Sequence, residues 1–347
     1  MSILLLLVFP VIISLFFFLY SNGKITWKEF LLQEVSLIVL ITVSFFTCSF
    51  LSIQDREIWN GRIMSKDKQY SSCCSTHSCN CHEVCSGSGS SRSCSTACDT
   101  CCDAGNSFSA VTSNGEIAYD DFCLSPLFSD PIRWKQIKIG EPTSIEHSYT
   151  NYLKASDTIL KKDANKEIKI PKYPKVFDYY RINRVLNDGV SADFSNLDNL
   201  LDELNADIGS SKQVNINIIL TKEADRYWAE NVRNEWIGGK KNDFIVVIGV
   251  PEYPKIKWAE VISWSDSEDC KLYVRNRIAA LEKFDDNDII KIISEEVEGK
   301  YVRKEMKDFN YLKYRIEPTK TVKIIIFPIG IILSIALSIL FRKKEII

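Results

Sequence analysis

Three apolar runs set the strongest limit on how this chain can fold. Ile3–Tyr20, Val35–Ile53 and Ile324–Phe341 each extend for 18 or 19 residues without a charged side chain. A helix needs about 20 apolar residues to cross the hydrocarbon core of a bilayer. Helices of soluble proteins seldom stay apolar on every face for so long. We therefore expect three transmembrane helices, two within residues 1–53 and one within residues 322–347.

The first run could instead be a cleaved signal peptide. Only Met1 and Ser2 precede it, so the basic region that opens a signal peptide is missing. A retained helix is the better interpretation. Thr26 and Glu29 have the spacing of a capping box, which predicts that the second helix starts there.

Basic residues in short flanking segments indicate the orientation. Lys24 and Lys28 lie between the first two runs, and residues 342–344 are all basic. The positive-inside rule places both segments in the cytoplasm and residues 54–321 outside it. Other basic residues flank the same runs on the opposite side, among them Arg56 and Lys320. Charge counting alone therefore only favours this orientation.

Cysteines are concentrated in one short segment. The chain has 12 Cys, and an even set of ten lies within or just beyond a Ser- and Gly-rich stretch that is poor in apolar residues. Such a set predicts a disulfide-stapled subdomain in an oxidising compartment, with a pairing that the sequence does not reveal. Residues 86–93 are expected to form a flexible loop. The ten candidates are Cys73, Cys74, Cys79, Cys81, Cys85, Cys94, Cys98, Cys101, Cys102 and Cys123.

A zinc site is the alternative role of this cysteine cluster. Four zinc ligands could come from Cys79, Cys81, His82, Cys98 and Cys101, with His77 as a spare. Their spacing is irregular and does not match a zinc finger or ribbon. We favour disulfides because they agree with the expected topology.

The residues around the cysteines have the pattern of a small β domain, residues 54–155. Glu57–Ile63 alternates about Asn60-Gly61, which predicts a hairpin turn. Ile132–Ile139 alternates again and is expected to be a strand. We expect an antiparallel β domain that carries the Cys-rich stretch as an excursion.

This domain resembles a group of membrane proteins encoded by tailed bacteriophages. The resemblance rests on residues 55–61, residues 79–92 and the segments around Gly140 and His147. It implies a setting in a prokaryotic envelope and carries no activity.

Helices alternate with buried strands after a charged linker, residues 156–178. Leu197–Ile208 and Ala224–Val232 have helical spacing, Val214–Leu220 and Phe244–Ile248 have the pattern of strands, and a further strand is expected over Ile256–Trp264. Two more helices are expected between Leu272 and Val297. This alternation predicts a layered α/β domain, residues 179–321. The whole chain is thus expected to be an α+β membrane protein.

Residues 179–303 resemble the TPM domain family. The resemblance rests on residues 227–230, on residues 235–243 and on the strand that follows them. It departs from the family at Phe244, where a Gly is usual. It implies an α/β domain held outside the cytoplasm, and it implies phosphatase activity for some members.

A turn precedes the strand that begins near Phe244. Trp236, Gly238, Gly239 and Asn242 form this turn motif, in which the glycines permit a left-handed helix end. Turn chemistry is the expected role of Asn242 and Asp243. The alternative is a Ca²⁺ or Mg²⁺ site. Its oxygen ligands would be Asp188, Asp193 and Asp243.

Charge and composition exclude several classes of function. The 43 basic and 45 acidic residues nearly balance, and the chain has no long basic run. Both features argue against nucleic acid as a partner. Three His leave little room for His-based catalysis. No catalytic residue can be named, so we expect a non-catalytic binding or assembly protein whose partners are the lipid bilayer and an envelope protein. A divalent-metal-dependent phosphatase of TPM type is the alternative.

Overall fold

The computed structural model describes residues 3–86, 93–153, 169–316, 318 and 320–343. The chain forms two compact units. One comprises Met1–Arg56, Ser148–Asp163 and Glu305–Ile347, and the other comprises Glu57–His147 and Ala164–Lys304. The expected loop tip, residues 87–92, and most of the expected linker lie outside the described residues. The antiparallel sheet and the α/β sheet, which we expected in separate domains, share the second unit.

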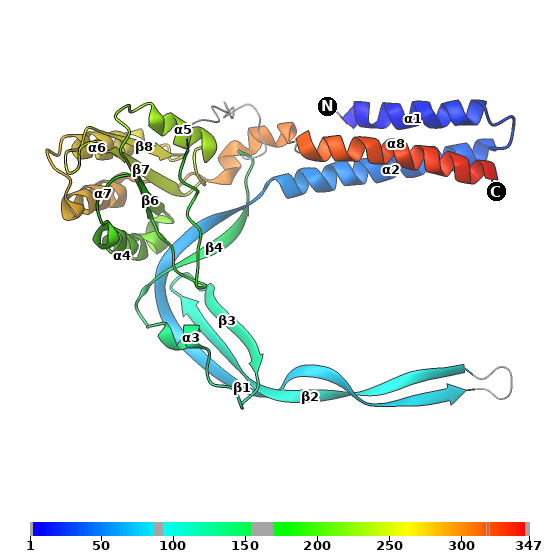
Figure 1. The fold of residues 1–347 in the computed structure, drawn as a ribbon, viewed down its shortest axis with the longest axis horizontal. Coiled ribbons are helices and arrows are strands. Elements are labelled where there is room, and N and C mark those ends of the chain that lie inside the picture. The colour runs from blue at the N-terminus through cyan, green and yellow to red at the C-terminus, as the bar shows by residue number, and fades with distance from the viewer. Residues whose placement is uncertain (1–2, 87–92, 154–168, 317, 319, 344–347) are drawn as a thin grey trace. The chain divides into compact units, whose positions relative to one another are not determined.

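The first unit is built on three apolar helices that contact one another, α1 (Ile3–Leu19), α2 (Trp27–Ser52) and α8 (Lys320–Lys343) (Figure 1). By length and composition, α2 and α8 could each cross a membrane. α1 has 17 residues and is shorter, so its crossing stays a prediction. The 3₁₀ helix η2 (Met306–Arg315) precedes α8. The predicted capping box is confirmed, because Thr26 and Glu29 bond to each other's backbone N–H groups.

Polar side chains join the three apolar helices. The Gln33 amide donates to the Ser334 carbonyl and to Ser338 Oγ, at 3.1 and 2.9 Å. Ser334 Oγ donates to the Pro10 carbonyl at 2.9 Å. Gly330 lets the helices approach, because a Cβ there would lie 3.3 Å from side-chain atoms of Pro10 and Ile41. Small and hydrogen-bonding residues of this kind hold helices together in lipid.

The Cys-rich sheet has the strand order β3-β2-β1-β4, and both β1–β2 and β2–β3 pair antiparallel. The bounds are β1 (Gln54–Ser86), β2 (Ser93–Thr112), β3 (Ile117–Leu124) and β4 (Pro142–Thr150). A small core gathers under it around Ile63, Phe108 and Tyr119. The expectation of an antiparallel, Cys-rich sheet is confirmed.

The predicted hairpin turn at Asn60-Gly61 is wrong, because β1 runs straight through it. Asn60 is buried, and its amide donates to the Val214 carbonyl at 2.9 Å. A Cβ on Gly61 would lie 2.3 Å from Ser113 Oγ. Gly61 therefore allows β1 to lie close to the turn that follows β2, and it forms no turn itself.

The predicted strand over Ile132–Ile139 is also wrong. The segment begins with the short helix α3 (Ile132–Gln136), which follows Pro131. Trp134 packs edge-on against Phe108 and donates to the Ser109 carbonyl at 3.0 Å. Ile132 and Ile139, which the alternation placed inward, are exposed. Anchoring of one tryptophan has overridden the local pattern.

The second sheet has the order β5-β6-β7-β8, in which the first three strands are parallel and β8 is antiparallel. Helices α4, α6 and α7 cover one face through a large apolar core, and α5 covers the other. The expected helices and buried strands are confirmed. The strands are β5 (Val185–Asp188), β6 (Asn215–Thr221), β7 (Asp243–Gly249) and β8 (Trp258–Ser263). The helices are α4 (Ser195–Lys212), α5 (Trp228–Glu235), α6 (Glu268–Ala279) and α7 (Asp286–Lys300).

A buried arginine links the two sheets of the second unit. Arg184 is 1% exposed, and its guanidinium donates to Asp202 of α4 at 2.8 Å. It also donates to Asn215 of β6, to Asn60 of β1 and to Ser144 of β4, at 2.5 to 2.6 Å. One side chain thus supplies hydrogen bonds to both sheets and to a helix.

We predict that Arg184→Met destabilises the full chain by roughly 3–5 kcal/mol. The substitution leaves the Asp202 carboxylate and several buried acceptors without their donor. The free energy of unfolding in detergent is the measurement. Arg181→Met is the control, because Arg181 is 44% exposed and its loss should cost less than about 1 kcal/mol. Equal effects of the two substitutions would contradict the role assigned to Arg184.

Candidate functional site

The disulfide ribbon is the part of β1 and β2 that extends past the pairing with β3. It comprises Ser71–Ser86 and Ser93–Asp103. Ser75–Ser86 pairs with Ser93–Asp103, whereas β3 begins to pair with β2 at Asn106. Figure 1 shows β1 and β2 continuing as two strands beyond the rest of their sheet. An isolated two-stranded ribbon is only marginally stable in water. Something other than sheet formation must therefore hold it.

Four disulfides supply that stability, and they are nested along the ribbon like rungs. Their Cα–Cα distances run from 4.0 to 5.8 Å, and their sequence separations fall from 29 to 9 toward the tip. Each bond restricts the unfolded chain, which favours the folded ribbon. Eight of the ten predicted disulfide candidates are thus paired. The pairs are Cys73–Cys102, Cys79–Cys101, Cys81–Cys98 and Cys85–Cys94.

Bulges bring these cysteines into register. The β1–β2 pairing shifts between Ser71 and Ser75 and again between Cys79 and His82. Asn80 lies inside the second shift with φ 48°, a left-handed conformation that Asn tolerates better than most residues. Extra residues on one strand twist a ribbon and redirect its side chains. The irregular cysteine spacing in the sequence is the counterpart of these bulges.

The ribbon has no core of its own. Among the ribbon residues that the structure describes, most side chains are exposed and the others are half-buried. Burial of apolar surface normally stabilises a sheet, and here only the cross-links can replace it. The result is a rigid, two-sided surface open to contact.

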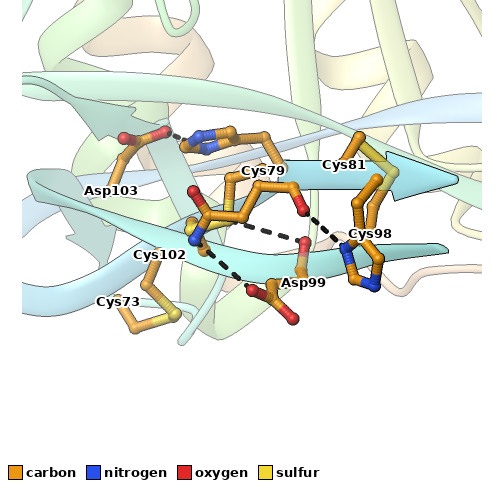
Figure 2. The surroundings of a disulfide bond; sticks show 11 residues. Cys73, Cys79, Cys81, Cys98, Asp99, Cys102 and Asp103 are labelled. Atoms are coloured by element: carbon orange, nitrogen blue, oxygen red, sulfur yellow. Dashed lines mark hydrogen bonds and ion pairs between the residues drawn. A yellow bond between two sulfur atoms is a disulfide. The ribbon is translucent and has the colours of Figure 1, made fainter.

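The carboxylates are the only permanently charged side chains in the described part of the ribbon. Glu83, Asp99 and Asp103 are its carboxylates, and the described ribbon contains neither Lys nor Arg. Asp103 contacts His77 Nδ1 across the strands at 3.0 Å, and Asp99 accepts from the Asn80 amide at 3.3 Å. Figure 2 shows Asp99 and Asp103 beside the disulfides. The ribbon therefore presents negative charge on a cross-linked frame.

The zinc alternative loses its ligands in this arrangement. Cys79 and Cys101 are bonded to each other, and so are Cys81 and Cys98. A sulfur in a disulfide carries no thiolate to offer a metal. Glu83, Cys85 and Cys94 bring ligand atoms within 4.8 Å of one another, but their sulfurs also form a disulfide.

Asp188, Asp193 and Asp243 do not form one ligand set. Asp188 ends β5 opposite Thr221, whereas Asp243 opens β7 opposite Asn215. Because these strands are parallel, the two carboxylates lie at opposite edges of the sheet, roughly 20 Å apart at ~3.3 Å per residue. Asp193 accepts from the backbone and hydroxyl of Ser195, and these bonds lower the pKa of its carboxyl.

The turn motif before β7 is structural. Gly238 and Gly239 have φ values of 70° and 81°, as the predicted left-handed helix end requires. A Cβ on Gly238 would lie 2.8 Å from the Trp264 ring. Trp236 donates to the Pro171 carbonyl at 2.9 Å, and the buried Asn242 donates to the Ile58 carbonyl at 2.8 Å.

Asp243 is fully buried within this turn. One of its oxygens accepts from Tyr173 at 2.9 Å and from the Asn215 amide at 2.7 Å. The other accepts from the Lys240 backbone N–H at 2.6 Å. Burial raises the pKa of this carboxyl to about 6, and the hydrogen bonds oppose the rise. The predicted turn role of Asp243 agrees with these contacts.

A cavity of about 400 Å³, which no sequence pattern predicts, lies beside the Arg184 network. Burial raises the pKa of Asp202 to about 6, against the effect of the Arg184 charge. Each of the four carboxylates that line this cavity makes at least one hydrogen bond within the chain. Glu141 bonds to Tyr180, Asp198 to the backbone of Arg184, Asp202 to its guanidinium and Glu203 to Arg62. The ribbon is therefore the better candidate site.

No model of a known protein family matches the chain, and neither does a curated protein or a solved structure. The resemblances to TPM domains and to phage membrane proteins stay predictions.

We predict that the stability of the chain falls as the pH rises from about 4 to 6, in part because of Asp243. Its folded pKa of about 6 lies above the ordinary value of 3.8, so the native state holds a proton that the unfolded state has lost. The full effect is of the order of 3 kcal/mol. Asp243→Asn cannot titrate and should flatten this dependence, measured as the free energy of unfolding in detergent across that range.

Asp120→Asn is the control for this experiment, because Asp120 is exposed. It should leave the pH dependence unchanged. The asparagine at 243 loses an acceptor and lowers stability at every pH, so the slope is the informative quantity. An unchanged slope in Asp243→Asn would contradict the assignment.

Proposed function

We propose that this chain is a non-catalytic, membrane-anchored binding protein of the cell envelope, and that the disulfide ribbon contacts its protein partner. In this proposal three helices cross the membrane, residues 54–321 lie outside the cytoplasm and the C-terminus lies inside. The α/β part, which resembles a TPM domain, would serve as the rigid base of the ribbon.

One observation carries the proposal: a cross-linked ribbon that buries none of its described side chains. Four disulfides stiffen two strand segments that contribute nothing to the core of their unit. A stiff arm loses little conformational entropy when it binds, which favours affinity. Its long strands also offer a backbone edge or face to another chain.

The chemistry of the ribbon supports an extracytoplasmic location. Disulfides persist in oxidising compartments and are rare where thiols are kept reduced. Two helices, α2 and α8, have the length and apolar composition of membrane anchors. Lys24 precedes α2 and Lys28 lies in its first turn, and Arg342 and Lys343 end α8. The positive-inside rule then favours the proposed orientation.

The charge of the ribbon indicates the chemistry of the partner. Its three carboxylates, without Lys or Arg among the described residues, favour a basic protein surface. No observation favours the phosphatase alternative, because Asp188 and Asp243 lie at opposite edges of the sheet.

Charge reversal on the ribbon tests the proposal. We predict that Glu83→Lys with Asp99→Lys lowers the yield of the chemically crosslinked partner at least fivefold, because both side chains are exposed and acidic. The measurement is crosslinking of the full-length protein in native membranes, followed by quantitative mass spectrometry of the captured proteins.

Glu252→Lys with Glu282→Lys is the matched control, since these glutamates are also exposed and lie outside the ribbon. The control should capture the same protein at the unaltered yield. Equal yields from both double variants would contradict the binding role of the ribbon. Non-reducing peptide mapping of each variant checks that the four disulfides have formed.

A further inference from the structure

Two cysteines at the base of the ribbon, one within it and one on β3, face each other without a bond. Cys74 of β1 and Cys123 of β3 remain as thiols although they belong to the ten clustered cysteines. The two thiols share a hydrogen bond. Both sulfurs lie above Gly105 of β2, because a Cβ built there would be 3.1 Å from each of them.

This meeting crosses a strand, since β2 lies between β1 and β3 in the sheet. Neighbouring strands are about 4.8 Å apart, so side chains two strands apart do not normally touch. The pairing of β1 with β2 shifts between Ser71 and Ser75, which places Cys74 in a bulge. The pairing of β2 with β3 shifts between Asn106 and Phe108, where Cys123 takes φ 64°.

Gly105 completes this arrangement. Its position between the two bulges is buried, and any side chain there would occupy the space of the two sulfurs. A Cβ would also lie 2.9 Å from the Leu124 carbonyl oxygen. Two bulges and a glycine therefore cooperate to bring one pair of thiols together.

We propose that Cys74 and Cys123 form a fifth, exchangeable disulfide that fastens β3 to β1 across β2. The oxidant is a disulfide of low molecular weight or of another protein. Unlike the four rungs, this bond joins the ribbon strand to the third strand of the sheet. Closing it fixes the base of the ribbon.

The exchange balances in two steps. One of the two cysteines attacks as its thiolate one sulfur of the external disulfide, forms a mixed disulfide and releases one external thiolate. The other cysteine then loses its proton and attacks the protein sulfur of the mixed disulfide, which forms the Cys74–Cys123 bond and releases the second external thiolate. Two protein thiols are oxidised, one external disulfide is reduced, and the two protons go to the two released thiols.

The hydrogen bond also affects the reactivity of the pair. The bond to Cys123 raises the pKa of Cys74 to about 11. The thiolate is the attacking species, so this bond slows attack by Cys74 while the pair is reduced. Cys270 is a poor competitor, because it is buried and burial raises the pKa of its thiol to about 11.

Thiol trapping on the full-length protein in detergent tests this proposal. The protein is purified without reductant, equilibrated with graded mixtures of reduced and oxidised glutathione, alkylated and mapped by mass spectrometry. We expect Cys74 and Cys123 to pass together from alkylated thiols to a disulfide. The eight rung cysteines should stay disulfide-bonded and therefore unalkylated. Their transition should lie at a ratio at least tenfold more oxidising than that of any rung.

Single variants separate this pair from the other cysteines. In Cys74→Ser, Cys123 should be alkylated or carry glutathione, with the four rungs intact. Cys270→Ser is the matched control and should leave the transition unchanged. Gly105→Ala should move the transition to a more oxidising ratio, because its methyl group crowds both sulfurs.

Two results would overturn the proposal. One is that Cys74 and Cys123 stay alkylated at every ratio while all four rungs have formed. The other is that either cysteine is found joined to a rung cysteine in the unsubstituted protein.

Discussion

Four disulfide bonds stabilise the ribbon, the part of this chain that has no hydrophobic core. The α/β sheet is stabilised by apolar side chains on both faces, and the three apolar helices pack through small and polar residues. The ribbon has neither source of stability. Its cross-links lie across bulges that the backbone adopts around Asn80 and between Ser71 and Ser75. The exposed acidic surface depends on those bonds, since it has no other support.

Periodicity predicted the elements whose burial is simple. β7 is buried on both faces and was recognisable as a continuous apolar run, and α4 was recognisable from leucines at helical spacing. The capping box at Thr26 and the glycines after α5 depend only on local backbone geometry. These features could be read from a few neighbouring residues because their physics is local.

Features that depend on distant contacts could not be predicted. Asn60-Gly61 has the composition of a turn, yet Asn60 bonds to β6 and Gly61 fits against Ser113. Arg184 precedes a short strand, and nothing in its neighbourhood signals that four partners from four elements surround it. The disulfide pairing depends on where the bulges fall. The sequence positions of Asp188 and Asp243 do not reveal that one ends its strand and the other begins its strand, which places them at opposite edges of the sheet.

The nested order of the four rungs has a mechanical consequence. A load that pulls the strands apart at the tip reaches Cys85–Cys94 first and stops there, because a covalent bond does not yield to forces that separate β strands. Cutting that bond exposes only the short segment before Cys81–Cys98. The paired strands can therefore separate only one disulfide at a time, from the tip inward. The inner segments stay paired after the outer ones have been lost.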